Sequence, residues 1–545
     1  MTQVRNATGA AVALIWVIAP VAARAETLAD AIAMAYRNNP TLQQQRAALR
    51  GLDENYVQAA AGLRPTIQLQ GVQTYEHERL GKAEIAAEQV RNVESNSVTG
   101  QIIVTQPLYT GGRVASQIRQ ARSQIRAGRQ GLRAAEGDLL LSVVNAYLSI
   151  RRDQQIVDVR RVALVEFVRQ YDEAKARRTA GDATLTDVAQ AQAELEAERA
   201  NFNDAQQALQ ADRASYTALV GQNPGELAPE PDLPNLPADV DKAFDIAESN
   251  SPDLKQAQET ELASRAAISE ARAAYRPTVA IQGTYGYTGI GVPIYGENLE
   301  RDLVVQAIVT QPLFTGGLNS SNIRKALEQN NSDRSGIEIA RRTAIQNVAT
   351  AWNEMLASRD DVATQKRQVD AARETTHGME EEYRAGQRST FEVLFAAETL
   401  RDAQISYLQA RFGAYVAAAT VLRYIGSLEA RELTVGTPKY DPAANLIRVS
   451  SVGALPWDPV VQAIDGFGAP GAGQHPLDAP AKDATPAFAP STGAVPDNAT
   501  LSVTLPVTPL PGTTAPDVPA AKQSGFVLPS LPFPSVFGGG DPAGK

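Results

Sequence analysis

The sequence predicts a mostly helical chain that also contains a few β-strands of membrane-spanning length and is built from two similar halves. The segment Gln-Pro-Leu-Tyr-Thr-Gly-Gly at 106–112 recurs as Gln-Pro-Leu-Phe-Thr-Gly-Gly at 311–317, displaced by 205 residues. An alternating apolar and polar run precedes each copy, which is typical of a half-buried strand. A long stretch with apolar residues seven apart follows each copy, which is typical of a coiled-coil helix. Two copies in matching surroundings indicate a duplicated unit.

The composition of the 545 residues argues against several kinds of site. The chain has no Cys, so we expect no disulfide, no thiolate metal site and no lipid-modified cysteine. The three histidines, His77, His377 and His475, have no metal-ligand spacing. A net charge of −10 argues against a nucleic-acid binder. No base–nucleophile arrangement emerges either, so we expect no enzyme activity, no cofactor and no metal.

Residues 1–25 are predicted to be a secretory signal peptide. Arg5 supplies the positive end, 9–21 form a short apolar core, and 23–25 are a small-x-small cleavage site, so the mature chain should begin near Glu26. No later segment approaches the roughly 20 apolar residues that a spanning helix needs. If the chain enters a bilayer, we therefore expect it to do so as strands.

The first repeat, 26–225, begins with two helices that end before Pro40 and Pro65. Each helix stops there because the residue before a proline is pushed out of helical geometry. Two alternating segments follow, at 66–75 and 98–107. Both have about ten residues, the length of a tilted membrane strand.

The end of the second strand predicts an abrupt change from strand to helix. Pro107 fits the end of a strand because proline cannot donate a hydrogen bond to its neighbour. Gly111 and Gly112 then give the backbone the freedom to turn into a helix. The following heptad pattern predicts a coiled-coil hairpin over 113–220, with its turn at Gly181.

The second repeat has the same order. A linker at 226–238 precedes the repeat at 239–426. Its predicted strands lie at 278–287 and 302–312, and its coiled-coil hairpin lies at 318–426. The equivalents of the junction and turn residues are each displaced by 205 positions: Pro312, Gly316, Gly317 and Gly386.

The pattern weakens towards the C-terminus. Residues 427–465 are predicted to form a periplasmic equatorial segment with little regular structure. Residues 466–545 contain 15 of the 32 prolines, together with much Ala, and so they are predicted to be a disordered tail.

Four strands per chain cannot close a wide barrel, and open sheet edges are not tolerated in lipid. We therefore expect the chain to oligomerise. Three copies would supply twelve strands and twelve long helices. The strands of such an assembly would form a closed wall in the bilayer, and the long helices would continue this wall below the membrane. The heptads alone favour a solvated scaffold or tether over a channel, whereas the strand pairs favour the channel.

From Glu26 to about Ile425 the chain resembles the TolC-like outer-membrane efflux family. The resemblance rests on the duplicated element order, the two strand–helix junctions, and two tip segments at 180–188 and 383–393. It implies a mostly α fold class with membrane β-structure: a trimeric 12-stranded outer-membrane β-barrel, with four strands per chain, continued by a long α-helical coiled-coil barrel in the periplasm. This homotrimer in outer-membrane lipid would conduct substrates without catalysis. The implied partners are a periplasmic adaptor (a membrane fusion protein) and an inner-membrane transporter of the RND or ABC type.

The resemblance also implies a gate at the periplasmic end, where polar contacts join the two hairpin tips. Tyr383 and Arg388 of the second tip would bind residues of the first tip, namely Thr186 and Asp187. The alternative is that these are ordinary surface charges, because an exposed pair contributes only about 0–1 kcal/mol.

Other tip residues are expected to shape the narrowest point of the pore. Glu392 would form a ring of acids, although the family places Asp there. Phe395 stands where many relatives have a second acid, so its apolar ring should narrow the pore and weaken cation binding there. Gly181 and Gly386 would let adaptor tips approach the turns, and helix-turn chemistry alone explains the two glycines equally well.

Three functions of different classes fit parts of this pattern. The first is an export duct for a tripartite efflux pump or a type I secretion system, in which the partner transporter chooses the substrate. The second is a passive diffusion porin, which would need more strands per chain and no coiled coils. The third is a structural periplasmic spacer or adaptor protein, which would lack the alternating strand pairs.

Overall fold

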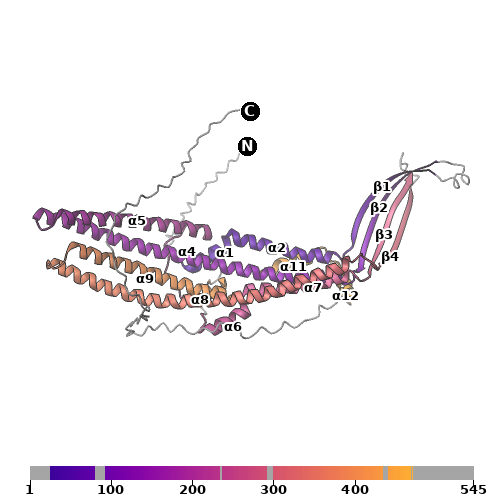
Figure 1. The fold of residues 1–545 in the computed structure, drawn as a ribbon. Helices are drawn as coiled ribbons and strands as arrows, with labels where there is room; N and C mark the ends of the chain where they lie inside the picture. Colours follow the sequence, from indigo (N-terminus) through magenta and orange to yellow (C-terminus); the bar gives the residue numbers. More distant parts are fainter. Residues whose placement is uncertain are drawn as a thin grey trace, which may run out of the picture. The chain divides into compact units, whose positions relative to one another are not determined.

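The computed structural model describes residues 25–79, 92–233, 236–290, 299–433, 440–467 and 469. The predicted signal peptide, apart from Ala25, and the predicted tail beyond residue 469 lie outside the described residues. The described chain is mostly helical with one four-stranded sheet, which confirms the predicted combination of long helices with four strands per chain (Figure 1).

The two halves share one order of elements. The first half comprises α1 (Leu28–Asn38), α2 (Pro40–Ala61), β1 (Thr66–Arg79), β2 (Asn92–Tyr109), α4 (Arg113–Ala180) and α5 (Leu185–Val220). The second half comprises α6 (Val240–Asn250), α7 (Pro252–Ala273), β3 (Thr278–Ile290), β4 (Glu300–Thr310), α8 (Leu318–Arg384) and α9 (Thr390–Tyr424). Three short helices follow: α10 (Ala430–Leu433), α11 (Ala444–Ser450) and α12 (Asp458–Gly466). None of the helices in the described part of the chain is both long and apolar enough to cross a bilayer.

The four strands form an antiparallel sheet in the order β1-β2-β3-β4. The register places most of the strongly exposed apolar side chains on one face, because Leu69 lies opposite Ile102, Ile102 opposite Tyr285 and Tyr285 opposite Leu303. This apolar face includes Ile67, Leu69, Ile102, Val104, Ile281, Tyr285, Tyr287, Leu303, Val305 and Val309. On the other face, amide side chains pair across strands, Gln101 with Gln70 at 2.9 Å and Gln306 with Gln282 at 2.7 Å.

Pairing across the sheet sets where each strand ends. β2 continues past Pro107 to Tyr109, with a register shift at this point, because β3 lies beside it and Tyr109 pairs with Val279. β4 is the edge of the sheet and ends at Thr310, so Pro312 lies beyond the strand. β1 and β2 are also longer than the predicted segments, with 14 and 18 residues.

The glycines of the two junctions have the left-handed backbone expected of a sharp turn. Gly111 and Gly112 have φ of 72° and 83°, and Gly316 and Gly317 have φ of 60° and 85°. At the first junction space is also restricted, because a Cβ on Gly111 would lie 2.8 Å from the Cβ of Arg276. We conclude that Gly111 is required by both its φ and its close neighbour.

Residues 440–467, which we call the C-terminal clasp, bind the first half where its strands become helices. Asn445 of α11 donates to buried Asp53 of α2 at 2.8 Å. Arg64 binds Asp458 of α12 at 3.1 Å and donates to the Val452 carbonyl at 2.8 Å. Beside these contacts, α12 contributes an apolar side chain to a small core with α2 and α4: Val461, with Ala60, Leu63, Val114 and Ile118.

Asp465 of α12 occupies the start of α4. Its carboxylate is fully buried and accepts from the Thr110 N–H at 2.6 Å, the Thr110 hydroxyl at 2.9 Å, the Gly112 N–H at 3.2 Å and the Ala115 N–H at 3.0 Å. A carboxylate in this position satisfies free N–H groups and opposes the positive end of the helix dipole.

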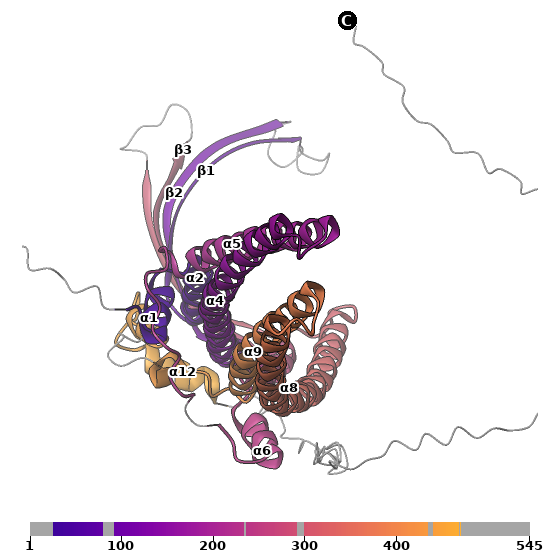
Figure 2. The ribbon, with the colours of Figure 1, turned by 90° about the vertical axis from the view of Figure 1, so that its left-hand side faces the viewer.

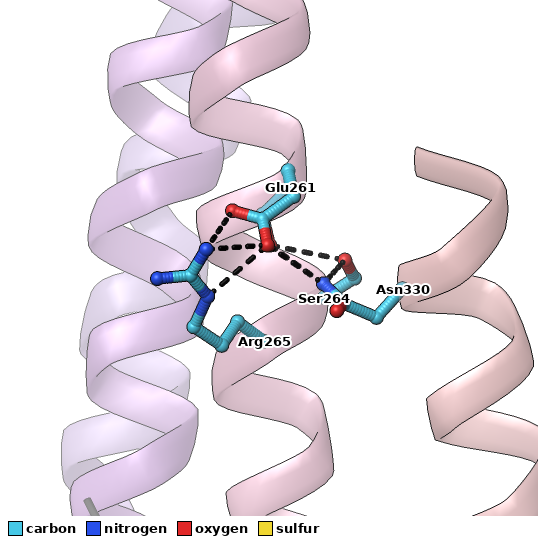
Figure 3. Close-up of polar contacts among 4 residues, drawn as sticks. All are labelled: Glu261, Ser264, Arg265 and Asn330. Atoms are coloured by element: carbon cyan, nitrogen blue, oxygen red, sulfur yellow. Dashed lines mark hydrogen bonds and ion pairs between the residues drawn. The ribbon is translucent and has the colours of Figure 1, made fainter. Parts of the chain in front are cut away.

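In the second half, a buried polar cluster joins α7 to α8 (Figure 3). Glu261 is 3% exposed and binds Arg265 one turn along α7, with both carboxylate oxygens within 2.8 Å of Nη2. Asn330 of α8 donates to Glu261 Oε1 at 3.1 Å and to Ser264 Oγ at 3.0 Å. The buried charge is therefore paired and hydrogen bonded, as burial requires.

Candidate gate at the hairpin tips

The long helices pair into two hairpins, α4 with α5 and α8 with α9, whose turns are the candidate gate (Figures 1 and 2). Gly181 ends α4 with φ of 90°, and Gly386 follows α8 with φ of 77°. A Cβ on either glycine would have no atom within 4 Å. The backbone conformation of each turn therefore favours glycine, and packing within the chain does not require it.

The first tip is held by a capping box at the start of α5. The Thr184 N–H and hydroxyl donate to Asp187 Oδ2 at 2.8 and 2.9 Å, and the Asp187 N–H donates to Thr184 Oγ1 at 3.2 Å. The bond from the Thr184 N–H holds the pKa of Asp187 below its ordinary value. Thr186 lies beside them on the exposed surface.

The second tip has a matching capping box and a charged network around Arg388. Ser389 donates to Glu392 Oε2 through its N–H and its hydroxyl, each at 2.9 Å. Arg388 donates to Glu392 Oε1 at 2.8 Å and to Glu382 Oε2 at 2.7 Å. The bonds from the Ser389 N–H and from Arg388 lower the pKa of Glu392 to about 2, and the bonds to Glu382 and Glu392 raise the pKa of Arg388.

The contact that joins the two tips within one chain involves a residue that the sequence reasoning missed. The Arg177 guanidinium, in the last turn of α4, lies 4.9 Å from the ring centroid of Tyr383, at the end of α8. This distance is typical of a cation–π contact. Arg177 also contributes to the lowered pKa of Asp187. The sequence feature that could have indicated a role for Arg177 is that it is a basic residue in the last helical turn before Gly181.

The residues that were predicted to bind one another across the tips bind other residues within the chain. Arg388 donates to Glu382 and Glu392 of its own hairpin, and Asp187 accepts from Thr184. Among the described residues, no bond joins Tyr383 or Arg388 to Thr186 or Asp187 within one chain. Between neighbouring subunits, this contact stays a prediction.

Phe395 lies one helical turn after Phe391 on the exposed face of α9. The two rings are 60% and 54% exposed, with centroids 6.4 Å apart and planes inclined by 22°. The second tip thus presents an apolar pair close to the charged network of Glu392. This placement is compatible with the predicted apolar narrowing, which stays a prediction.

Below the tips, a buried charge network ties the first hairpin to the second. Glu198 of α5 is 1% exposed, and its Oε2 lies 3.2 Å from Arg160 Nη1 and 3.1 Å from Arg401 Nη1. Arg401 belongs to α9, and its guanidinium lies 5.4 Å from the ring centroid of Phe167 on α4. A groove of about 610 Å³ runs between the hairpins here, and its walls include Phe167, Arg401 and Tyr407.

The pKa directions at the tips predict how the gate responds to acid. Conductance in planar bilayers should stay constant from about pH 7 to about pH 5 and rise progressively between about pH 4 and about pH 2. A carboxylate with a lowered pKa keeps its bonds above its ordinary pKa and loses them as the pH falls through the lowered value. Glu392, with a pKa of about 2, and Asp187, with a lowered pKa, both behave in this way. A rise centred near about pH 4.5, the ordinary value for a free carboxyl, would contradict the assignment.

Comparison with known proteins gives a consistent result. The family model described as "Outer membrane efflux protein" matches residues 31–222 and 243–427. The chain is 29% identical over 422 residues to the outer membrane efflux protein BepC of Brucella suis, covering 77% of this chain and 90% of BepC. It is 22% identical over 426 residues to the outer membrane protein TolC of Escherichia coli, covering 75% of this chain and 84% of TolC.

A solved structure shows the same fold. The outer membrane protein VceC of Vibrio cholerae superposes with a TM-score of 0.63 at 20% identity, over 73% of this chain and 96% of VceC. The two segments that the family model matches contain both strand pairs and both hairpins. From this we conclude that the chain belongs to the outer membrane efflux protein family and is an outer membrane protein with its long helices in the periplasm.

Proposed function

We propose that three copies of this chain form a passive export duct that carries substrates from an inner-membrane transporter to the exterior. The observation that carries the proposal is the sheet, which has one apolar face and two open edges and continues directly into helices of 68 and 67 residues. At 1.5 Å per residue such helices are about 100 Å long. A lipid-facing wall would thus be joined to a long periplasmic tube.

The second strand–helix junction supports closure by further copies. Leu313 and Phe314 are 93% and 89% exposed, whereas their counterparts at the first junction, Leu108 and Tyr109, are half-buried beside β3. β4 has no strand on its outer side within the described chain, and neither has β1. Pairing of β4 with β1 of the next copy would cover this junction and remove both edges, which lipid does not tolerate.

In this proposal the duct works in a tripartite efflux pump or a type I secretion system. A periplasmic adaptor would bind the tips and the groove between the hairpins, and an RND or ABC transporter would supply the energy and choose the substrate. The chain itself would conduct passively and catalyse nothing. The alternative of a periplasmic spacer leaves the apolar face of the sheet without a role.

The experiment that tests the duct uses protein purified from the outer membrane. We expect an oligomer of three chains that dissociates on heating, and stepwise conductance when it is added to planar bilayers. Crosslinking at the tips should capture an adaptor and a transporter. A water-soluble monomer with no channel activity would refute the duct and favour the spacer.

Substitution at the turns separates adaptor contact from helix-turn chemistry. We expect Gly181→Asn or Gly386→Asn to reduce co-purified adaptor several-fold while the oligomer remains intact. Asn tolerates a left-handed backbone, so the turn is kept and a side chain is added to its surface. Gly221→Asn is the matched control, because Gly221 ends α5 with φ of 89° at the far end of the same hairpin. Unchanged adaptor binding in all three variants would mean that turn chemistry alone explains the glycines.

A further inference from the structure

Helix α12 has its acidic side chains inside and its apolar side chains outside. Asp458 and Asp465 are 7% and 0% exposed. The apolar side chains that share the opposite stripe are 48–87% exposed: Trp457, Val460, Ile464 and Phe467. Their spacing of three and four residues places them on one side of the helix. A soluble surface helix shows the reverse distribution, so this face needs an apolar partner.

The contacts of the two acids fix which way α12 faces. Asp458 binds Arg64, and Asp465 accepts from the backbone at the start of α4. Val461, between them, is buried in the core that α12 shares with α2 and α4. Because these three side chains point into the molecule, the stripe that begins at Trp457 must point away from it.

The position of α12 along the chain's long axis is also fixed. Asp465 accepts a hydrogen bond from Thr110, the residue that follows the last residue of β2. Figure 1 shows α12 at the base of the strands, where they pass into the helices. The inference rests on the proposed duct: with the apolar face of the sheet in the outer membrane, α12 lies at the depth of the inner boundary of that bilayer.

We infer that the outer stripe of α12 binds the periplasmic leaflet of the outer membrane. Trp and Phe are side chains that anchor proteins at a membrane–water boundary, and a short helix with one apolar face lies in the plane of such a boundary. The stripe would continue the apolar surface of the sheet downward by one helix. On the adjoining α11, Ile447 is 69% exposed beside exposed Arg448, which suits an acyl chain next to a lipid phosphate.

Tryptophan fluorescence tests this inference in the intact oligomer. The chain has three tryptophans, and Trp16 lies in the predicted signal peptide. A chain with Trp16→Phe and Trp352→Phe keeps only Trp457, and it would be reconstituted in vesicles of phosphatidylcholine brominated on the acyl chains near the headgroup. We expect strong quenching of Trp457 by these lipids and little quenching by iodide.

Two matched variants serve as controls for lipid quenching, one with a buried tryptophan and one with a tryptophan on the apolar face of the sheet. A chain with Trp16→Phe and Trp457→Phe keeps only Trp352, which is 8% exposed on α8 and should not be quenched by the lipids. Leu303→Trp, in a chain without the three native tryptophans, reports whether the apolar face of β4 lies in lipid. Quenching at position 303 without quenching at Trp457 would overturn the inference and leave the duct intact.

The emission of Trp457 identifies what covers the stripe if lipid does not. Unquenched, blue-shifted emission would indicate a neighbouring subunit or another segment of protein, and iodide quenching would indicate water; either result overturns the inference. Loss of lipid quenching at both 303 and Trp457 would refute the membrane wall itself. Only quenching of Trp457 by brominated lipid supports the proposal.

Discussion

Replacing Asp465 with alanine should destabilise the folded chain by about 3 kcal/mol or more, because three backbone N–H groups lose their acceptor. The carboxylate is fully buried and binds Thr110, Gly112 and Ala115 at 2.6–3.2 Å. Each buried N–H group left without a partner costs about 1–3 kcal/mol, reduced where water can enter. The positive end of α4 would also lose its opposing charge.

Asp465→Asn should cost less, and its effect separates the two contributions. Three of the four bonds, those from the Thr110 N–H, the Thr110 hydroxyl and the Gly112 N–H, go to Oδ1, which an amide oxygen can replace. The bond from the Ala115 N–H to Oδ2 and the negative charge would be lost. The measurement is the urea concentration or temperature at which the oligomer in detergent unfolds.

The matched control for these variants is Glu354→Ala, which removes an exposed acid from α8. It should leave the free energy of unfolding within about 0.5 kcal/mol of the parent. A result for Asp465→Ala as small as that for Glu354→Ala would show that Asp465 does not hold the junction.

Arg388→Ser combined with Tyr383→Phe should raise single-channel conductance several-fold. Serine removes the guanidinium that is predicted to bind the first tip of a neighbouring subunit, together with its bonds to Glu382 and Glu392. Phenylalanine removes the hydroxyl that is predicted to bind the same tip and that accepts from Thr390 at 3.4 Å. The ring that lies against Arg177 is kept, so the double variant removes polar contacts with little loss of packing.

The size of the effect follows from the number of subunits. An exposed polar contact contributes about 1 kcal/mol at most. In a trimer, about 3 kcal/mol in total would change the ratio of open to closed entrances about 100-fold. Conductance is measured on single channels in planar bilayers with the same salt on both sides.

The control for the gate is Arg342→Ser, which breaks an exposed pair with Glu338 on α8, 2.7 Å long and away from the tips. Its conductance should equal that of the parent. If the double variant at the tips behaves like this control, Arg388 and Tyr383 are ordinary surface residues and the gate lies elsewhere.

Local sequence patterns predicted the fold class because each depends on neighbours close in the chain. Alternation over about ten residues indicates a strand and heptads indicate a coiled coil, wherever the partners lie. The strand–helix junctions were also predicted from the sequence, since Gly111 and Gly316 have the positive φ that it suggested. The exact strand ends were not predicted, because β2 runs to Tyr109 only where β3 pairs with it.

The sequence predicted where the candidate gate lies but not which side chains meet there. The tips were recognised from the turns at Gly181 and Gly386, and the capping residues Asp187 and Glu392 lie where helix starts require acids. The contact of Arg177 with Tyr383 was not predicted. Heptad spacing orients each helix along its own hairpin and gives no information about which side chains meet between hairpins.

The duplicated order of elements, the membrane-length strands and the long hairpins could all be predicted from local, periodic patterns. The return of the C-terminal clasp to the first repeat could not, because Asp465 binds Thr110 across 355 residues of chain. A single buried carboxylate has no period, and its partner is chosen by which free N–H groups the folded chain brings to it. For the same reason the apolar stripe of α12 becomes visible only once its acids are seen to face inward.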